Sequence, residues 1–269
     1  MTDPDDIRRH YGNESLIERL KAALPPGDQS LSPAQLAPLD QFHTLGAKAT
    51  SDLAELAGVT KPARVLDIGS GLGGPARLIA ATYGCRVTGV DLSAPFVEAA
   101  RYLTERTGQG ETVTFATASA LDLPFSAGAF DIALLQHVAM NINDRARLYG
   151  EIHRVLAAGG RFATFDIVSV SGEPIYPLPW ARTADLSALM TAQATCAAVE
   201  AAGFTTLSRR DDTPAAIAWF AKLHDVGPPP APNLVTIMGA DFPVLTGNLA
   251  GNLTAGRLAV LSAVFEKIA

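Results

Sequence analysis

The feature that most constrains the fold is a short apolar run that leads directly into a cluster of glycines, at residues 65–74. Apolar residues over 63–68 predict a buried strand, and residues 75–83, closed by Gly84, predict the helix that follows it. Glycines between a strand and a helix allow a tight turn and let the backbone approach a ligand without a Cβ in the way. The free N–H groups at the start of the helix would face that ligand. The segment therefore predicts a ligand-binding turn.

Apolar runs alternate with amphipathic segments along most of the chain. Further strands are expected at 85–90, 112–116, 129–136, 161–168, 204–209 and 257–267. Helices are expected at 94–107, 144–157 and 191–202, the first two capped by Ser93 and Asn143. Strands that alternate with helices are joined by crossover connections, which produce a parallel sheet with helices on its faces.

Four segments of different character divide the chain. Residues 1–60 are expected to form an N-terminal helical cap or lid, in which Ser32 begins a capping box. Residues 61–212 are expected to form the ligand-binding core, 213–255 a helical insertion with a proline-rich stretch, and 256–269 the closing strand. Because the cap and the insertion fall at the ligand-binding end of the sheet, we expect them to cover an enclosed, mainly apolar pocket.

Two acidic residues bear on the nature of the ligand. Residues 69–74 also satisfy the G-x-G-x-x-G pattern of dinucleotide-binding proteins, so the glycines alone do not decide between ligands. Asp67 precedes the first glycine by two positions, where a carboxylate is a poor neighbour for a pyrophosphate but a good partner for a cation. Asp91 ends the second strand, where it can accept hydrogen bonds from a ribose in either case.

These residues resemble the motif series of class I S-adenosylmethionine-dependent methyltransferases. The series continues with Asp-Leu-Pro-Phe at 122–125, Phe-Asp at 130–131 and the glycine pair at 159–160, so the resemblance covers roughly residues 40–210. It implies an α/β fold with a seven-stranded, mostly parallel, doubly wound sheet and an antiparallel last strand. It also implies S-adenosyl-L-methionine as cofactor and S-adenosyl-L-homocysteine as product. The motifs say little about the substrate.

The resemblance implies cofactor-binding residues at the ends of the first four strands: Asp67, Gly69, Ser70, Gly71, Gly73, Asp91, Leu92, Ser119, Ala120, Leu121 and Gln136. By this resemblance, Asp67 and the glycines hold the methionine part, and Asp91 binds the ribose hydroxyls beside Leu92. Ser119 stands where many relatives carry an acid that binds the adenine amino group. Gln136 is expected beside the reacting methyl.

Three residues are candidates for catalysis, namely His137, Gln136 and His43. Methyl transfer from a sulfonium is an in-line displacement, so the enzyme mainly aligns the nucleophile and excludes water. A general base is needed only where the nucleophile is protonated at neutral pH. His137 is the best candidate base because it follows Gln136 at the expected cofactor mouth, although a histidine satisfied by a backbone carbonyl is the alternative. His43 lies in a segment before the sheet that helps to close the site in related enzymes, and Trp180 is a candidate wall of the pocket.

Composition narrows the partners. The formal net charge is −6 and no run of Lys or Arg stands out, which disfavours a nucleic-acid partner. Cys85 and Cys196 lie far apart, so neither a disulfide framework nor a thiolate metal site is expected, and no metal is expected. No window approaches the ~18 continuous apolar residues of a membrane span. We therefore expect a cytoplasmic protein with a small-molecule substrate and no membrane insertion, and leave a homo-oligomer open.

The expected function is transfer of a methyl group from S-adenosyl-L-methionine to an N, O or C nucleophile of a small molecule. Two alternatives stay open at this point. A non-catalytic S-adenosylmethionine-binding subunit would bind the cofactor tightly without turning over any substrate. An NAD(P)-dependent oxidoreductase would bind NAD(P)H, and the carboxylate of Asp67 argues against it.

Overall fold

A seven-stranded sheet in the order β3-β2-β1-β4-β5-β7-β6 forms the centre of the fold. The computed structural model describes residues 16–27, 29–227 and 232–268. The strands are β1 (Arg64–Ile68), β2 (Arg86–Asp91), β3 (Val113–Thr117), β4 (Phe130–Gln136), β5 (Leu156–Ser169), β6 (Phe204–Asp211) and β7 (Leu258–Lys267). Only β7 among these runs antiparallel to its neighbours, which confirms the expected sheet. The strand order reverses between β1 and β4, so a ligand crevice is expected at their carboxyl ends.

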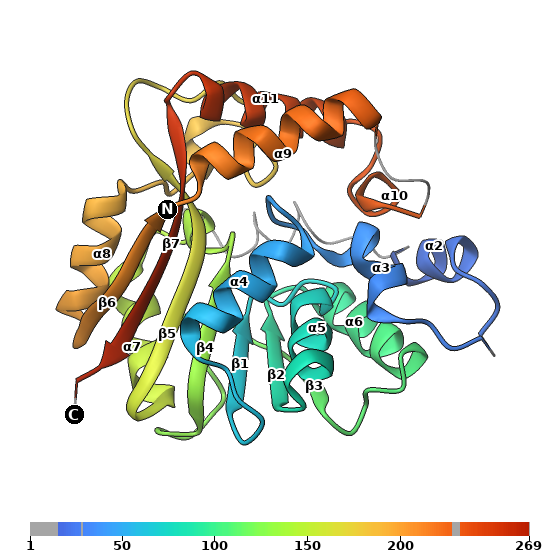
Figure 1. Cartoon of the computed structure of the whole chain (residues 1–269), viewed down its shortest axis with the longest axis horizontal. Coiled ribbons are helices and arrows are strands. Elements are labelled where there is room, and N and C mark those ends of the chain that lie inside the picture. The colour runs from blue at the N-terminus through green and yellow to red at the C-terminus, as the bar shows by residue number, and fades with distance from the viewer. Residues whose placement is uncertain (1–15, 28, 228–231, 269) are drawn as a thin grey trace.

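Helices cover both faces of this sheet (Figure 1). On one face lie α4 (Ala47–Ala57), α5 (Gly74–Tyr83) and α6 (Ala94–Arg106), and on the other lie α7 (Arg145–Val155) and α8 (Ala192–Ala201). Side chains of each strand alternate between the two faces, so Val65 packs in the first layer and its neighbour Leu66 in the second. The parallel strands are therefore buried on both sides, as their continuous apolar runs predict.

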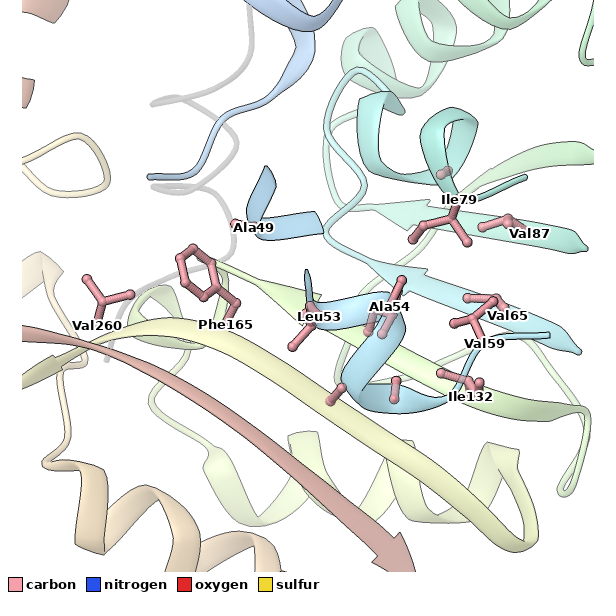
Figure 2. Close-up of a cluster of buried hydrophobic side chains, with 14 of the residues drawn as sticks. Ala49, Leu53, Ala54, Val59, Val65, Ile79, Val87, Ile132, Phe165 and Val260 are labelled. Atoms are coloured by element: carbon pink, nitrogen blue, oxygen red, sulfur yellow. The ribbon is translucent and has the colours of Figure 1, made fainter. Parts of the chain in front are cut away.

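The helix α4 belongs to the core rather than to the N-terminal cap. Figure 2 shows Leu53 and Ala54 of α4 in one cluster with Val65 of β1 and Ile132 of β4. Since Leu53 and Ala54 are both buried, the cap expected over residues 1–60 is shorter than predicted at its carboxyl end. We use "the cap" below for residues 16–46.

The cap consists of α2 (Leu16–Ala23), α3 (Pro33–Asp40) and the segment that follows them. Residues 1–15 of the expected cap lie outside the described residues. The capping box at Ser32 is confirmed, with Gln35 as its other half. Leu20 of α2 and Leu36 of α3 pack into one apolar cluster with Leu103 of α6, so the cap lies against the β2–β3 side of the core.

The segment between β6 and β7 forms α9 (Thr213–Val226), α10 (Leu234–Met238) and α11 (Phe242–Thr254). We call residues 213–254 "the C-terminal helices". Figure 1 shows α9 and α11 lying over one end of the sheet, while α10 contacts α2 and α3 of the cap. The described part of the chain contains no helix that is both long enough and apolar enough to span a membrane.

Two local expectations are wrong at the start and end of α7. Asp144 rather than Asn143 is the N-cap, and its carboxylate accepts the N–H of Arg147 at 3.0 Å. The helix ends at Val155 instead of 157, because Leu156 already pairs with Phe130 of β4 and so begins β5. Ser93 does occupy the N-cap position of α6, but its side chain makes no capping hydrogen bond.

Candidate active site

A cavity of about 1030 Å³ lies at the carboxyl ends of β1, β2 and β4, between the core, the cap and the C-terminal helices. All the predicted site residues line this cavity except Gly73. Trp180, the candidate wall residue, also lines it, and its indole nitrogen donates to Ser187 Oγ at 2.9 Å. Within the described ranges, no group of three or more His, Cys, Asp or Glu side chains is placed to hold a metal ion.

The three glycines of the turn are required for different physical reasons. Gly69, Gly71 and Gly73 all have positive φ, between +51° and +77°, which side chains rarely adopt. A Cβ at Gly69 would collide with Val138, and a Cβ at Gly73 would collide with the ring of Phe115. Gly73 is therefore required by its packing against Phe115 and does not line the cavity. Gly69 and Gly71 line the cavity with their backbone atoms.

Asp67, the penultimate residue of β1, is a buried side chain that lines the cavity. Its side chain is 2% exposed, and no described donor is bonded to its Oδ2. Burial and the nearby charge of Asp91 raise the pKa of Asp67 to about 7. A buried acceptor without a partner is costly, so a cationic group placed against it would be strongly favoured. The need of Asp67 for a hydrogen-bond donor fits the cationic methionine part of S-adenosylmethionine.

Asp91 links the glycine turn to the turn after β2. Its Oδ2 accepts the N–H of Gly71 and its Oδ1 accepts the N–H of Ser93, both at 2.9 Å. Burial raises the pKa of Asp91, and these backbone hydrogen bonds act against that rise. Each carboxylate oxygen retains a second lone pair, so the vicinal hydroxyls of a ribose can still bind here. Leu92 follows it in the cavity wall.

Ser119 shapes the turn after β3. Its hydroxyl oxygen accepts the N–H of Leu121 at 3.1 Å, and its backbone carbonyl accepts the N–H of Asp122. Ala120 and Leu121 lie beside it in the cavity wall. The hydroxyl proton of Ser119 is not used in this turn, so it can be donated to a ring nitrogen of a bound adenine.

A buried polar network joins the cap to the end of β4. The hydroxyl of Thr50 lies 3.1 Å from Gln136 Oε1 and 3.1 Å from His43 Nε2. His43 Nδ1 lies 3.2 Å from the carbonyl oxygen of Thr44. Since a carbonyl only accepts, this nitrogen carries the proton, and both ring nitrogens are used within the network. Burial lowers the pKa of His43 to about 4, so its ring is neutral at pH 7.

His137 lies just after β4 in a strained backbone conformation. It is one of two described non-glycine residues with positive φ, at +53°. Its ring stacks on Phe165 with centroids 5.2 Å apart, and its Nε2 lies 3.3 Å from the hydroxyl of Thr44. Burial first, and then the nearby His43, lowers the pKa of His137 well below its usual value. The ring is therefore neutral at pH 7, which is the form that accepts a proton, and the lowered pKa makes it a weaker base than a free imidazole.

Several cavity residues lie outside the sequence predictions. Thr44 lines the cavity from a turn and Thr50 lies in α4 outside the lining, and each contacts a histidine, but an isolated threonine gives no signal of this in the sequence. Trp219 and Phe220 line the cavity from α9. Of the residues of α9, only Ala216 is buried, so two adjacent large aromatics on this helix are the signal that could have found the wall.

The comparisons with known proteins agree with this geometry. Residues 66–164 match the family described as "Methyltransferase domain". Methyltransferase phqN of Penicillium fellutanum is 30% identical over 182 residues, which cover 64% of this chain and 56% of that protein. The chain thus spans little more than half the length of this curated relative.

Two solved structures share the fold. Geranyl diphosphate C-methyltransferase from Streptomyces coelicolor A3(2), solved with Mg²⁺, geranyl diphosphate and S-adenosyl-L-homocysteine, has a TM-score of 0.73 at 18% identity and covers 98% of this chain and 97% of its own. The [4+2]-cyclase SpnF has a TM-score of 0.62 at 23% identity, with 82% and 80% covered. The fold is that of class I, Rossmann-like, S-adenosylmethionine-dependent methyltransferases. The stretch that matches the methyltransferase-domain family, residues 66–164, runs from β1 into β5.

Proposed function

We propose that this chain transfers a methyl group from S-adenosyl-L-methionine to an N, O or C nucleophile of a small molecule, inside an enclosed and mainly apolar pocket. The observation that carries this proposal is Asp67. A buried carboxylate with an unsatisfied oxygen beside the glycine turn suits a cationic cofactor and would repel a pyrophosphate. This favours S-adenosylmethionine over a nicotinamide dinucleotide.

In this proposal, different predicted residues bind different parts of the cofactor. Asp67 would bind the cationic methionine part together with the glycine turn at Gly69 and Gly71. Asp91 accepts hydrogen bonds from the ribose, and Ser119 lies at the adenine edge. When bound, the cofactor supplies an electrophilic methyl group on a sulfonium.

The histidines have separate roles in this proposal. His137 accepts a proton from the nucleophile where that nucleophile is protonated, because its ring is neutral and faces the cavity. His43 is a positioning residue, because both its ring nitrogens are already bonded within the cap network. Gln136 Oε1 lies 3.1 Å from the hydroxyl oxygen of Thr50, which places the amide of Gln136 next to the same network.

The C-terminal helices are proposed to be the substrate lid. Residues of α9, α10 and α11 line the same cavity as the glycine turn, so a bound acceptor would be enclosed between them and the core. Enclosure excludes water from the methyl-transfer step and holds the nucleophile in line with the methyl group.

The first test is calorimetric titration with S-adenosylmethionine, S-adenosylhomocysteine and NADH. We expect micromolar binding of the first two and none of NADH, with Asp91→Ala abolishing the binding. Binding of NADH instead would make the chain an oxidoreductase. The fold neighbour named as a cyclase is a reason to measure turnover as well, since one fold supports several reactions. Formation of S-adenosylhomocysteine with a panel of acceptors is therefore the second readout, and tight binding without any turnover would indicate a non-catalytic subunit.

A further inference from the structure

The cavity has an unusual charge composition for its size. Among the described residues that line it there is no Arg and no Lys, while there are four aspartates: Asp40, Asp67, Asp91 and Asp144. An anionic ligand buried in a cavity needs a cationic side chain or a cluster of donors to offset the loss of its hydration. The described lining offers no Arg or Lys for this purpose. Of its three histidines, His43 and His137 have lowered pKa values, and His224 is exposed near the end of α9.

Each aspartate of the lining already has a partner or an assigned role. Asp40 is bound to the buried guanidinium of Arg77 at 2.7 Å. Asp144 caps α7 through the N–H of Arg147. Asp67 and Asp91 bind the cofactor under the proposed function, on which this inference rests. Asp144 keeps its charge but is exposed, so no buried carboxylate of the lining is left to neutralise a cationic substrate.

The part of the cavity beyond the cofactor residues is walled by large apolar side chains. Trp219, Phe220 and Leu223 come from α9, Met238 from α10, and Leu249 from α11. The same helices also contribute the polar His224 and Thr246, and Asn233 precedes α10 in the lining. On the core side, His137 and Thr44 lie 3.3 Å apart. The wall from the C-terminal helices is thus mainly apolar, and polar side chains lie beside the cofactor residues.

We propose that the methyl acceptor is uncharged when bound and has an extended apolar body that lies under the C-terminal helices, with its polar group against His137. Carboxylates, phosphates and ammonium compounds of the same shape are poor ligands, since each would bury a charge without a countercharge. The diphosphate bound by the Streptomyces coelicolor protein is accordingly outside this class.

The two tryptophans of the chain allow ligand binding to be measured without an assay of turnover. Trp180 and Trp219 are its only tryptophans, and both line the cavity, so intrinsic fluorescence reports its occupancy. The probes are 1-decanol, decanoate and decylamine, which share one apolar chain and differ in head-group charge. Titrations are made at pH 8, above the usual pKa of histidine, with and without S-adenosylhomocysteine. We expect decanol to bind at least about tenfold more tightly than either charged probe. Equal or tighter binding of decanoate or decylamine overturns the proposal.

A charge-reversal variant sharpens the result. Leu223→Arg places a cation in the apolar part of the cavity and should shift the decanoate-to-decanol affinity ratio by about tenfold in favour of decanoate. Leu207→Arg makes the same chemical change on β6, where the leucine is 47% exposed and does not line the cavity, and should leave the ratio unchanged. A shift of equal size in both variants would show that the ratio reflects overall charge, and would overturn the proposal.

The two proposals fail separately. Calorimetry with S-adenosylhomocysteine tests the cofactor site and does not depend on the probes. Normal cofactor binding together with tight decanoate binding overturns the charge inference alone. Absence of cofactor binding overturns the proposed function and, with it, the identification of the acceptor as a methyl acceptor.

Discussion

The cap and the C-terminal helices cover the same cavity, but the core holds them by different chemistry. Arg77 of α5 donates to Asp40 of the cap at 2.7 Å, with neither side chain more than 2% exposed. Arg106 of α6 donates at 2.9 Å to three backbone carbonyls of the cap, those of Pro25, Pro26 and Gln29. The cap is therefore fixed by directional, charge-assisted bonds, which have narrow geometric tolerance.

The C-terminal helices have fewer buried anchors. Among the residues of α9, only Ala216 is buried. Asn252 of α11 exchanges two hydrogen bonds with the main chain of Ile175, at 2.8 and 2.9 Å. The ion pair between Arg182 and Asp241 is about half exposed and contributes little. We infer that the cap is a permanent part of the cofactor site and that the C-terminal helices are the part that opens.

Removing the C-terminal helices is the strongest test of this comparison. Because β6 and β7 are antiparallel neighbours, with Asp212 N–H bonded to the carbonyl of Val260, a short Gly-Ser turn can replace residues 213–254. We expect turnover to fall by more than about 1000-fold, since the acceptor is no longer aligned. Affinity for S-adenosylhomocysteine should change by less than about threefold. Turnover retained in a variant whose thermal unfolding is still cooperative would disprove the lid.

Disrupting the cap should instead lower the free energy of unfolding. Asp40→Asn leaves the Arg77 guanidinium buried without a countercharge and should lower the free energy of unfolding by about 3–5 kcal/mol. The matched change at the C-terminal helices, Arg182→Met, should cost less than about 1 kcal/mol. Urea unfolding with the slope compared between variants measures both. The double variant Asp40→Leu/Arg77→Met should recover much of the loss, and similar losses in the two single variants would remove the distinction between the regions.

The sequence predicted the proposed cofactor end of the cavity better than the proposed substrate end. The strand ends of β1, β2 and β4 are adjacent in any doubly wound sheet, so Asp67, Asp91 and Gln136 had to meet once those strands were located. Their spacing is a local property of the sequence. Gly73 does not line the cavity, and its positive φ together with the ring of Phe115 already requires a glycine there.

The substrate end depends on contacts between distant segments. Arg77 and Asp40 lie 37 positions apart, and no local pattern reveals that they pair. Trp219 of α9 lines the cavity together with Trp180, which follows β5, and only the path of the whole chain brings them together. The sequence predicted a helical insertion over residues 213–255, but it could not indicate which faces of α9 and α11 would line a cavity.

Substitutions of the two histidines test whether His137 accepts a proton while His43 of the cap only positions its neighbours. His137→Phe preserves the stack on Phe165 but removes the proton acceptor, and should lower kcat by about 100-fold for an acceptor that must lose a proton. His43→Gln should lower kcat less and reduce thermal stability, because it disturbs the network around Thr50. The pH profile of kcat separates the roles, since only His137→Phe should remove its acidic limb. A His137→Phe enzyme with unchanged kcat on such an acceptor would refute the base.

The smallest expected effect is a pH dependence of cofactor affinity, which depends on residues of the core alone. Burial, aided by Asp91, raises the pKa of Asp67 to about 7 in the free protein, and a bound cation lowers it by favouring the carboxylate. The complex therefore holds fewer protons than the free protein, so binding releases a proton and affinity falls by up to about tenfold for each pH unit below 7. Calorimetry with S-adenosylmethionine in two buffers of different ionisation enthalpy counts the proton. Asp67→Asn should bind more weakly and without this dependence. Since Asp67 lies on β1, the variant without residues 213–254 should keep the dependence unchanged, and its loss there would mean that the C-terminal helices help to bury Asp67 and are not separable from the cofactor site.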